Sequence, residues 1–97
     1  MATLTIDFAE DVIKFKKLLS SLGGKRRIRI LKLISDGKDW TISDMAKRMD
    51  CGIPNVSQQV TELEKAGLIV KQLSKTQGNN MKFIKPVYDE ILIRLKE

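Results

Sequence analysis

The 97-residue chain is long enough for one domain with a modest hydrophobic core and too short for two. Its 42% hydrophobic and 31% charged residues are typical of a soluble globular protein, and no apolar run is long enough to cross a membrane. The single cysteine excludes an internal disulfide, the absence of histidine removes His-based catalytic pairs and metal sites, and with no signal-peptide pattern we expect a cytoplasmic protein.

The first third of the chain predicts two helices. Residues 6–24 carry a stripe of apolar residues spaced three and four apart, which is the spacing of one helix face, and Gly23-Gly24 ends it. Residues 25–37 resume that spacing with isoleucine and leucine and end at Asp36-Gly37. We therefore expect two consecutive amphipathic helices.

Two shorter helices are expected next. Thr41, with Asp44 three residues later, resembles a capping box for a third helix whose buried side is Met45, Ala46 and Met49. After the turn "DCG", a fourth helix begins near Pro54, since proline is tolerated in a first turn. It buries Val56, Val60 and Leu63, and Gly67 is placed to act as its left-handed C-terminal cap.

The last third predicts a hairpin and a closing helix. The β-prone runs "LIVKQLS" and "MKFIKP" flank "KTQGNN", which indicates a hairpin with a loop longer than two residues. In "PVYDEILIRLKE" the residues Val87, Ile91 and Leu95 align at helical spacing, with Tyr88 and Leu92 beside them. We expect residues 86–97 to be helical.

The net charge of +6 is concentrated in two segments. Residues 23–32 carry +5, and residues 67–85 carry +4 without a single acidic residue. Such clustering is expected of a surface that binds phosphate groups, although an anionic membrane or an acidic protein would also be attracted to it.

The segments "RRIRILKLISDG", "TISDMAKRM" and "VSQQVTELEKAGLIVKQ" resemble, in this order, the conserved pattern of ArsR-type winged helix-turn-helix transcription regulators. The resemblance covers roughly residues 22–85, and "LEKAGLI" at the end of the fourth helix is its most specific part. It implies a mainly α fold with a small β-hairpin: a DNA-binding core over 23–85, with a wing over about 68–85. It also implies dimerisation helices over 1–22 and 86–97.

In this frame the fourth helix is the recognition helix. A step of 100° per residue turns Asn55, Gln58 and Thr61 outward and places Ser57 and Gln59 on the flanks. Amides match the donor and acceptor pattern of adenine in the major groove, and hydroxyls can contact several bases. We expect these five residues to contact bases; the alternative is that polar side chains simply cover a solvated helix.

Contacts with the DNA backbone are expected from the wing and the second helix. The residues are Lys25, Arg26, Arg27, Lys71, Lys75, Gln77, Asn79, Asn80 and Lys82. A lysine-bearing hairpin can also be only a soluble edge that resists aggregation, and Arg27 and Arg29 can instead pair within the fold.

The resemblance implies a homodimer formed by the first and last helices. The corresponding interface residues are Phe8, Val12, Phe15, Leu19, Val87, Tyr88, Ile91 and Leu95. Many ArsR-type proteins carry paired cysteines or histidines that sense metals, whereas this chain has "SDMAKRM" at the cysteine positions. We therefore expect Cys51 to be a small buried hydrophobic residue and the protein to need no metal or cofactor.

Together these features predict a dimeric, sequence-specific regulator of transcription that binds double-stranded DNA in the nucleoid, most simply as a repressor at a palindromic operator. Two alternatives stay open: an architectural protein that binds DNA with little sequence preference, and a winged-helix module that binds another protein. An enzyme is disfavoured, because no histidine, phosphate-binding glycine loop or cysteine–base pair is present. The sequence does not identify an effector molecule.

Overall fold

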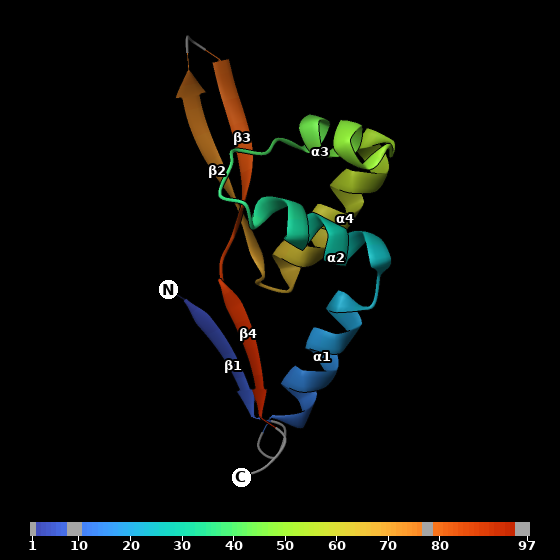
Figure 1. The fold of residues 1–97 in the computed structure, drawn as a ribbon, viewed down its shortest axis with the longest axis vertical. Coiled ribbons are helices and arrows are strands. Elements are labelled where there is room, and N and C mark those ends of the chain that lie inside the picture. Colours follow the sequence, from blue (N-terminus) through green and yellow to red (C-terminus); the bar gives the residue numbers. More distant parts are fainter. Residues whose placement is uncertain (1, 8–10, 77–78, 95–97) are drawn as a thin grey trace.

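The computed structural model describes residues 2–7, 11–76 and 79–94, and it is elongated, with extents of 51 × 26 × 20 Å. Eight elements follow one another along the described chain (Figure 1). They are β1 (Thr3–Asp7), α1 (Val12–Leu22), α2 (Lys25–Ile34), α3 (Ile42–Met49), α4 (Ile53–Lys65), β2 (Ile69–Thr76), β3 (Asn79–Pro86) and β4 (Glu90–Arg94).

The predicted ends of α3 and α4 are confirmed by the backbone. The Thr41 hydroxyl oxygen accepts a hydrogen bond from the Asp44 amide at 3.1 Å, which satisfies one free N–H of the first turn of α3. Pro54 lies in the first turn of α4. Gly67 has φ +78°, a left-handed conformation that glycine adopts at little cost, and it turns the chain from α4 into β2.

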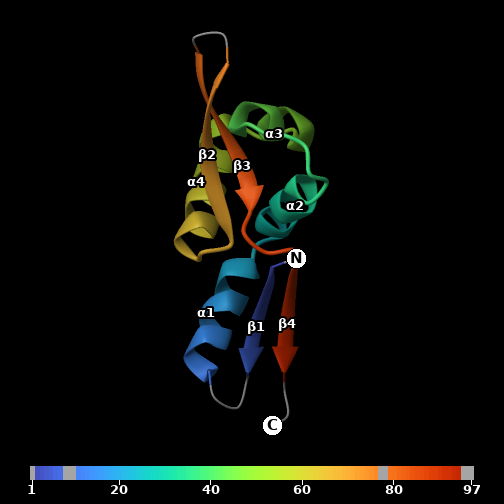
Figure 2. The same ribbon diagram turned by 90° about the vertical axis from the view of Figure 1, so that its left-hand side faces the viewer.

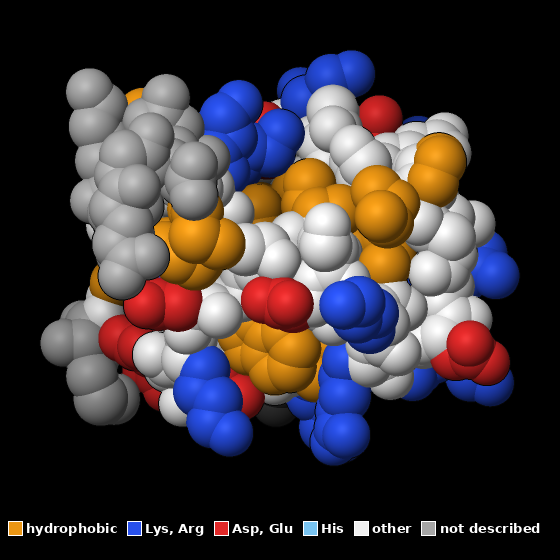
Figure 3. Space-filling view, turned by 90° about the horizontal axis from the view of Figure 1, so that it is seen from above, with side chains coloured by type: hydrophobic (Ala, Val, Ile, Leu, Met, Phe, Trp, Pro, Cys, Tyr) orange, Lys and Arg blue, Asp and Glu red, His pale blue; other side chains and the backbone are white. Residues whose placement is uncertain are grey.

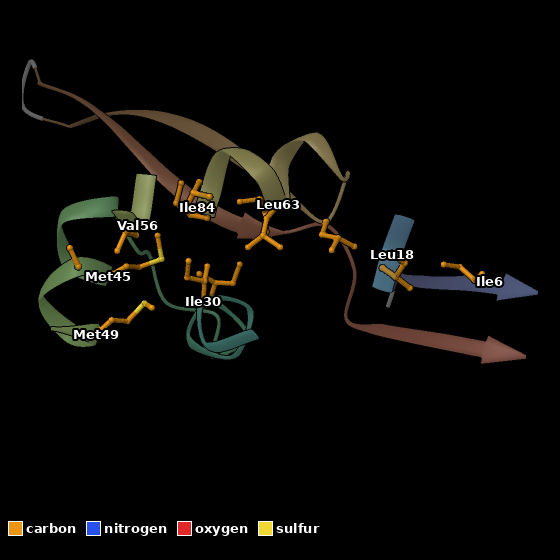
Figure 4. Close-up of a cluster of buried hydrophobic side chains, with 13 residues drawn as sticks. Ile6, Leu18, Ile30, Met45, Met49, Val56, Leu63 and Ile84 are labelled. Carbon is orange, nitrogen blue, oxygen red and sulfur yellow. The ribbon is translucent and has the colours of Figure 1, made fainter. Parts of the chain in front are cut away.

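One hydrophobic core holds the three central helices against the hairpin (Figure 4). Ile30 of α2, Met45 of α3, Leu63 of α4 and Ile84 of β3 are completely buried. A smaller group, Ile6 and Leu18, fixes β1 against α1 (Figure 4). The helical spacing in the sequence thus selects the side of each helix that is buried.

The hairpin is longer than the sequence predicts. β2 and β3 pair antiparallel from Ile69↔Pro86 to Thr76↔Asn79, so strand pairing extends into the segment expected to be a six-residue loop. The expectation of a long loop over "KTQGNN" was therefore wrong, because the backbone pairing of Lys75 with Asn80 and of Thr76 with Asn79 overrides the weak strand preference of asparagine. Trp40 adds a short bridge, its carbonyl accepting from the Ile84 amide at 2.8 Å.

The ends of the described chain differ most from expectation. Residues 90–94 form strand β4 instead of a helix over 86–97, and residues 3–7 form strand β1 ahead of a helix that begins only at Val12. β1 and β4 pair in parallel from Thr3↔Glu90 to Asp7↔Arg94 (Figure 2). The helix predicted over 86–97 is therefore wrong, and the N-terminal helix is shorter than the predicted 1–22.

The physical reason is that each strand provides the other with its hydrogen-bonding partner. β1 alternates polar and apolar residues and β4 contains two β-branched isoleucines, features that favour a strand once a neighbouring strand exists. Asp89 begins the pairing, because its amide donates to the Ala2 carbonyl and its carboxylate accepts from the Ala2 amide, each at 2.8 Å. Ile6 and Ile91 then pack toward the core beneath α1.

Within the described residues, the structure contains no helix with the length and apolar character required to cross a membrane.

The turn after α2 provides a test of the fold in solution. The Asp36 carboxylate accepts hydrogen bonds from the Lys38 amide at 2.8 Å and from the Trp40 indole at 3.0 Å, and these bonds lower the pKa of Asp36. Because the folded state favours the ionised form, the turn's contribution to stability is present above the ordinary aspartate pKa and is lost as the pH falls through the lowered value.

We therefore expect fluorescence of Trp40, the single tryptophan, to change with a midpoint below the ordinary aspartate pKa. Asp36→Asn should abolish this transition while the protein stays folded, and Asp39→Asn is the matched control that should retain it. A transition that persists in Asp36→Asn would show that another acid controls the indole environment.

Candidate nucleic-acid interface

The orientation of α4 about its own axis is fixed by its buried side. Val56, Val60 and Leu63 are at most 1% exposed and face the core. Gln58 lies on the opposite side and is exposed, and among the described residues it makes no hydrogen bond. Ile53, in the first turn of α4, is 52% exposed. The N-terminal half of α4 therefore presents an uncharged surface with one unoccupied amide.

The other predicted base-contacting residues are less available. The Gln59 side-chain oxygen accepts from Arg27 Nε at 2.8 Å, and the Thr61 hydroxyl donates to the Ser57 carbonyl at 2.9 Å. The Asn55 side-chain oxygen is buried and finds no hydrogen-bond partner among the residues that the structure describes. Asn55 and Gln59 therefore cannot offer both ends of their amides to a base edge in this conformation.

Arg27 is half-buried, and its guanidinium is bonded within the fold. Besides Gln59, its guanidinium donates to the carbonyls of Ser20 and Ser21 at 3.4 and 3.3 Å. One side chain of α2 thus joins the end of α1 to the middle of α4. Arg27 was predicted as a backbone contact, with an internal partner as the alternative; the structure places it in the internal role, with an amide and two carbonyls in place of an acid.

The start of α2 has the features of an anion-binding site. Gly24 caps the helix without a side-chain hydrogen bond, and the first turn holds no acidic residue. The exposed Lys25, Arg26 and Arg29 line an open hollow together with Gln59 of α4. Because the free N–H groups of a helix N-terminus favour negative charge, basic residues here are favourable when an anion is bound.

This hollow is one end of a basic band that extends over α2 and α3. Arg29 also lines a second hollow with Lys32 and Arg48. Arg48 lines a third with Lys38 and Lys47, a hollow that Asp39 and Asp44 also line. We define the basic band as these residues together with those at the start of α2: Lys25, Arg26, Arg29, Lys32, Lys38, Lys47 and Arg48.

Sequence reasoning missed the α3 part of the band. The segment 33–53 has a net negative charge, so its lysine and arginine did not stand out in a count along the chain. The available signal was the helical period, which places Lys47 and Arg48 on the side of α3 opposite its buried methionines.

The wing retains less free charge than its composition indicates. Lys71 Nζ lies 3.5 Å from a carboxylate oxygen of Glu64 on α4, and Lys85 forms an ion pair with Asp39. Lys82 is exposed. Gln77 lies outside the described residues, and the side chains of Lys75, Asn79 and Asn80 are likewise not described. Figure 3, viewed from the end that holds the wing tip and α3, shows lysine and arginine side chains around exposed hydrophobic ones.

The predicted dimer-interface residues fall into two groups. Val12 and Leu19 are 54% and 49% exposed on α1, whereas Phe15, Tyr88 and Ile91 pack against the core of their own chain. Val87 is half-buried, and its amide donates to the Leu68 carbonyl. Phe8 and Leu95 lie outside the described residues.

Cys51 is half-buried against the core, with its thiol donating to the Met49 carbonyl at 3.4 Å. No group of three or more Cys, Asp or Glu side chains suited to holding a metal ion is found in the described part of the chain. Cys51 packs against the core as a small hydrophobic residue, but it is less buried than the sequence predicts.

Comparisons with known proteins identify the fold. The sequence model of the HVO_A0114 family matches residues 24–93, more than two thirds of the chain. No curated protein matches. Among solved structures, reduced HlyU from Vibrio cholerae is similar with a TM-score of 0.68 and 20% identity, over 81% of this chain and 78% of that one.

A second similar structure is that of Mb0332 from Mycobacterium bovis, described as a homodimeric winged helix-turn-helix DNA-binding domain of a possible ArsR-family transcriptional regulator. Its TM-score is 0.68 at 16% identity, over 81% of this chain and 68% of that one. These likenesses confirm the predicted winged helix-turn-helix fold, in which α3 and α4 form the helix-turn-helix and β2 and β3 the wing.

The two roles assigned to basic residues of α2 can be separated by mutation. Arg27→Ala should lower the free energy of unfolding by about 1–3 kcal/mol, because it leaves Gln59 and two carbonyls without their charged donor. The exposed Lys25→Ala should change it by less than about 0.5 kcal/mol. Urea denaturation followed by circular dichroism measures both. Equal effects of the two substitutions would contradict the internal role of Arg27.

Proposed function

The chain belongs to the HVO_A0114 family and has a winged helix-turn-helix fold, and from the surface of α4 we propose that it is a sequence-specific regulator of transcription that binds double-stranded DNA as a homodimer. It inserts α4 into the major groove and represses by occupying promoter DNA. The observation that carries the proposal is the exposed, uncharged N-terminal half of α4, centred on Gln58, with basic residues of α2 beside it.

Base recognition is assigned to the N-terminal half of α4. Gln58 offers a free donor and a free acceptor, the pair that recognises the adenine edge in the major groove. Ile53 is exposed in the first turn of α4 and suits the methyl group of thymine, and Ser57 and Thr61 lie near Gln58 on the helix. The C-terminal half carries Glu62 and Glu64, whose charges oppose close approach to phosphates. The helix therefore enters the groove by its N-terminal end.

Backbone contacts are assigned to two sets of residues. The first is the part of the basic band at the start of α2, where Lys25, Arg26 and Arg29 adjoin Gln59. The second is the wing, where Lys82 is exposed and Lys71 and Lys85 are held by acidic partners. Such contacts position a protein on the duplex and make its affinity dependent on salt, while base contacts supply specificity.

The extent of the basic band also favours a second candidate, an architectural protein that binds DNA with little sequence preference. Selection from a random duplex library at near-physiological salt distinguishes the two. Enrichment of a palindrome with half-sites about one helical turn apart supports the regulator. Retention without enrichment, decreasing steeply with salt, supports the architectural protein. No retention contradicts both and favours a module that binds protein.

Gln58→Ala should relax the preference at one base position in each half-site while non-specific affinity stays nearly unchanged. Loss of one bidentate contact corresponds to about 1–3 kcal/mol of discrimination per half-site. The measurement is a repeated selection, with Gln72→Ala on the exposed surface of β2 as a glutamine control. An unchanged motif for Gln58→Ala would remove Gln58 from base recognition.

Lys25→Ala should weaken binding to all sequences alike and reduce the slope of log K against log salt by about 1. Lys16→Ala on the exposed side of α1 removes the same charge away from the basic band and is the matched control. Titrations by fluorescence anisotropy at several salt concentrations give both slopes. If the two variants behave identically, the charge near α2 acts only through the net charge of the protein.

A further inference from the structure

The parallel pair β1–β4 is an incomplete sheet. In the described residues it has only two strands, and α1 covers one face through Ile6 and Leu18. Parallel strands are ordinarily buried within larger sheets, and an isolated pair of strands is only marginally stable. Each outer edge also leaves a row of backbone N–H and C=O groups available for another strand. The sheet is thus suited to extension by a further chain.

The two edges have different surroundings. β1 adjoins a hollow that its residues line together with Lys14, Lys17 and Ser21 of α1. The helical period places Val12 and Leu19 on the other side of α1, and both are about half exposed. On β4, Ile93 is 37% exposed, and in Figure 2 no element lies beside the edge of β4 that faces away from β1. The β4 edge is therefore the apolar one.

We propose that two copies of this chain dimerise by antiparallel pairing of their β4 strands, centred on Leu92, to form one four-stranded sheet in the order β1-β4-β4-β1. This inference rests on the proposed function and extends it, because it names the surface through which two copies form the dimer that recognises a palindrome. It replaces the helical interface expected from the sequence with a strand interface.

The sequence of β4 is complementary to itself in this register. With Leu92 opposite the partner subunit's Leu92, Glu90 lies opposite the partner subunit's Arg94, and the two-fold axis repeats this pair. Ile91 lies opposite the partner subunit's Ile93 on the face covered by α1. A register centred on Ile91 or Ile93 would instead pair a charged residue with an apolar one. Opposite charges across strands stabilise pairing and like charges destabilise it. The charged residues therefore favour the register centred on Leu92.

The charged groups are positioned for this pairing. The Glu90 carboxylate accepts a hydrogen bond from the Thr3 hydroxyl at 2.7 Å, which holds it at the surface of the sheet. Arg94 is exposed, and within the described residues it forms no ion pair. In the dimer each arginine gains a carboxylate, and Val12 and Leu19 of the two α1 helices lie on one face of the continuous sheet.

The geometry is also compatible with one DNA duplex. In both ribbon views α1 and α4 lie on the same side of the strands (Figures 1 and 2). A two-fold axis perpendicular to the joined sheet keeps both α1 helices on one face of the dimer. Both α4 helices then face that same side, as two recognition helices reading a palindrome must.

Charge reversal tests the register. Sedimentation equilibrium of the full chain should show a dimer. Glu90→Arg or Arg94→Glu alone should raise the dissociation constant of this dimer at least about tenfold, because each variant places like charges opposite one another at both symmetry-related positions. The double variant, Glu90→Arg with Arg94→Glu, restores opposite charges and should return the constant to within about threefold of the original. A purely monomeric chain, or single reversals without effect, would overturn the proposal.

Cross-linking tests the same pairing without relying on charge. Leu92→Cys should form an intermolecular disulfide under mild oxidation, since the two side chains are neighbours across the axis. Thr5→Cys, which lies beside Leu92 in the sheet but on β1, is the matched control and should not cross-link. Cross-linking of Thr5→Cys instead of Leu92→Cys would overturn the proposal in favour of the β1 edge. Circular dichroism confirms that each variant is folded.

Neither measurement contains DNA, so the two proposals can fail separately. A β4-paired dimer that enriches no duplex sequence would retain this interface and refute the specific regulator. A dimer that enriches a palindrome but passes neither test would retain the regulator and refute this interface.

Discussion

The burial of one side of α4 is the constraint on which the surface of the molecule depends. Val56, Val60 and Leu63 each lose nearly all contact with water, and rotating the helix to expose them would forfeit roughly 1.5–3 kcal/mol for each side chain. That cost fixes the opposite side outward. The outward position of Gln58 is therefore determined by three residues that are buried inside the protein. The hydrogen bond from Arg27 to Gln59 joins α4 to α2, and the bonds from Arg27 to the Ser20 and Ser21 carbonyls join α2 to α1.

Much of the central fold was predictable, because its signals are local. Thr41 before α3, Pro54 at the start of α4 and Gly67 at its end act on the few residues around them, and the helical spacing identified the buried sides. The ends of the described chain were not predictable in this way. Val87 and Ile91 lie four residues apart, a spacing that fits either a helix or one face of a strand, and only the pairing of β4 with β1 decides between them.

In the candidate site, too, local features were predictable and contacts between distant residues were not. Composition correctly placed basic residues on α2 and helical spacing correctly turned Gln58 outward, but neither reveals which side chains are occupied within the fold. Gln59 and Arg27 are 32 positions apart in sequence, and their hydrogen bond exists only because α2 and α4 are packed together. Likewise Lys71 and Lys85 count fully toward the net charge, yet each is held by a carboxylate from another element. A count of charges overstates what a surface can offer to phosphates.

The parallel pairing of β1 with β4 has a consequence for the order of folding. The hydrogen bond between Thr3 and Glu90 joins residues 87 positions apart, whereas the contacts among α2, α3, α4 and the hairpin span shorter stretches of chain. Closing so long a loop carries an entropic cost that must be met before its contacts contribute, and contacts between distant residues form slowly. The winged helix-turn-helix core can therefore assemble first and hold the two ends near each other. β1 and β4 pair last and, with few buried side chains between them, separate first.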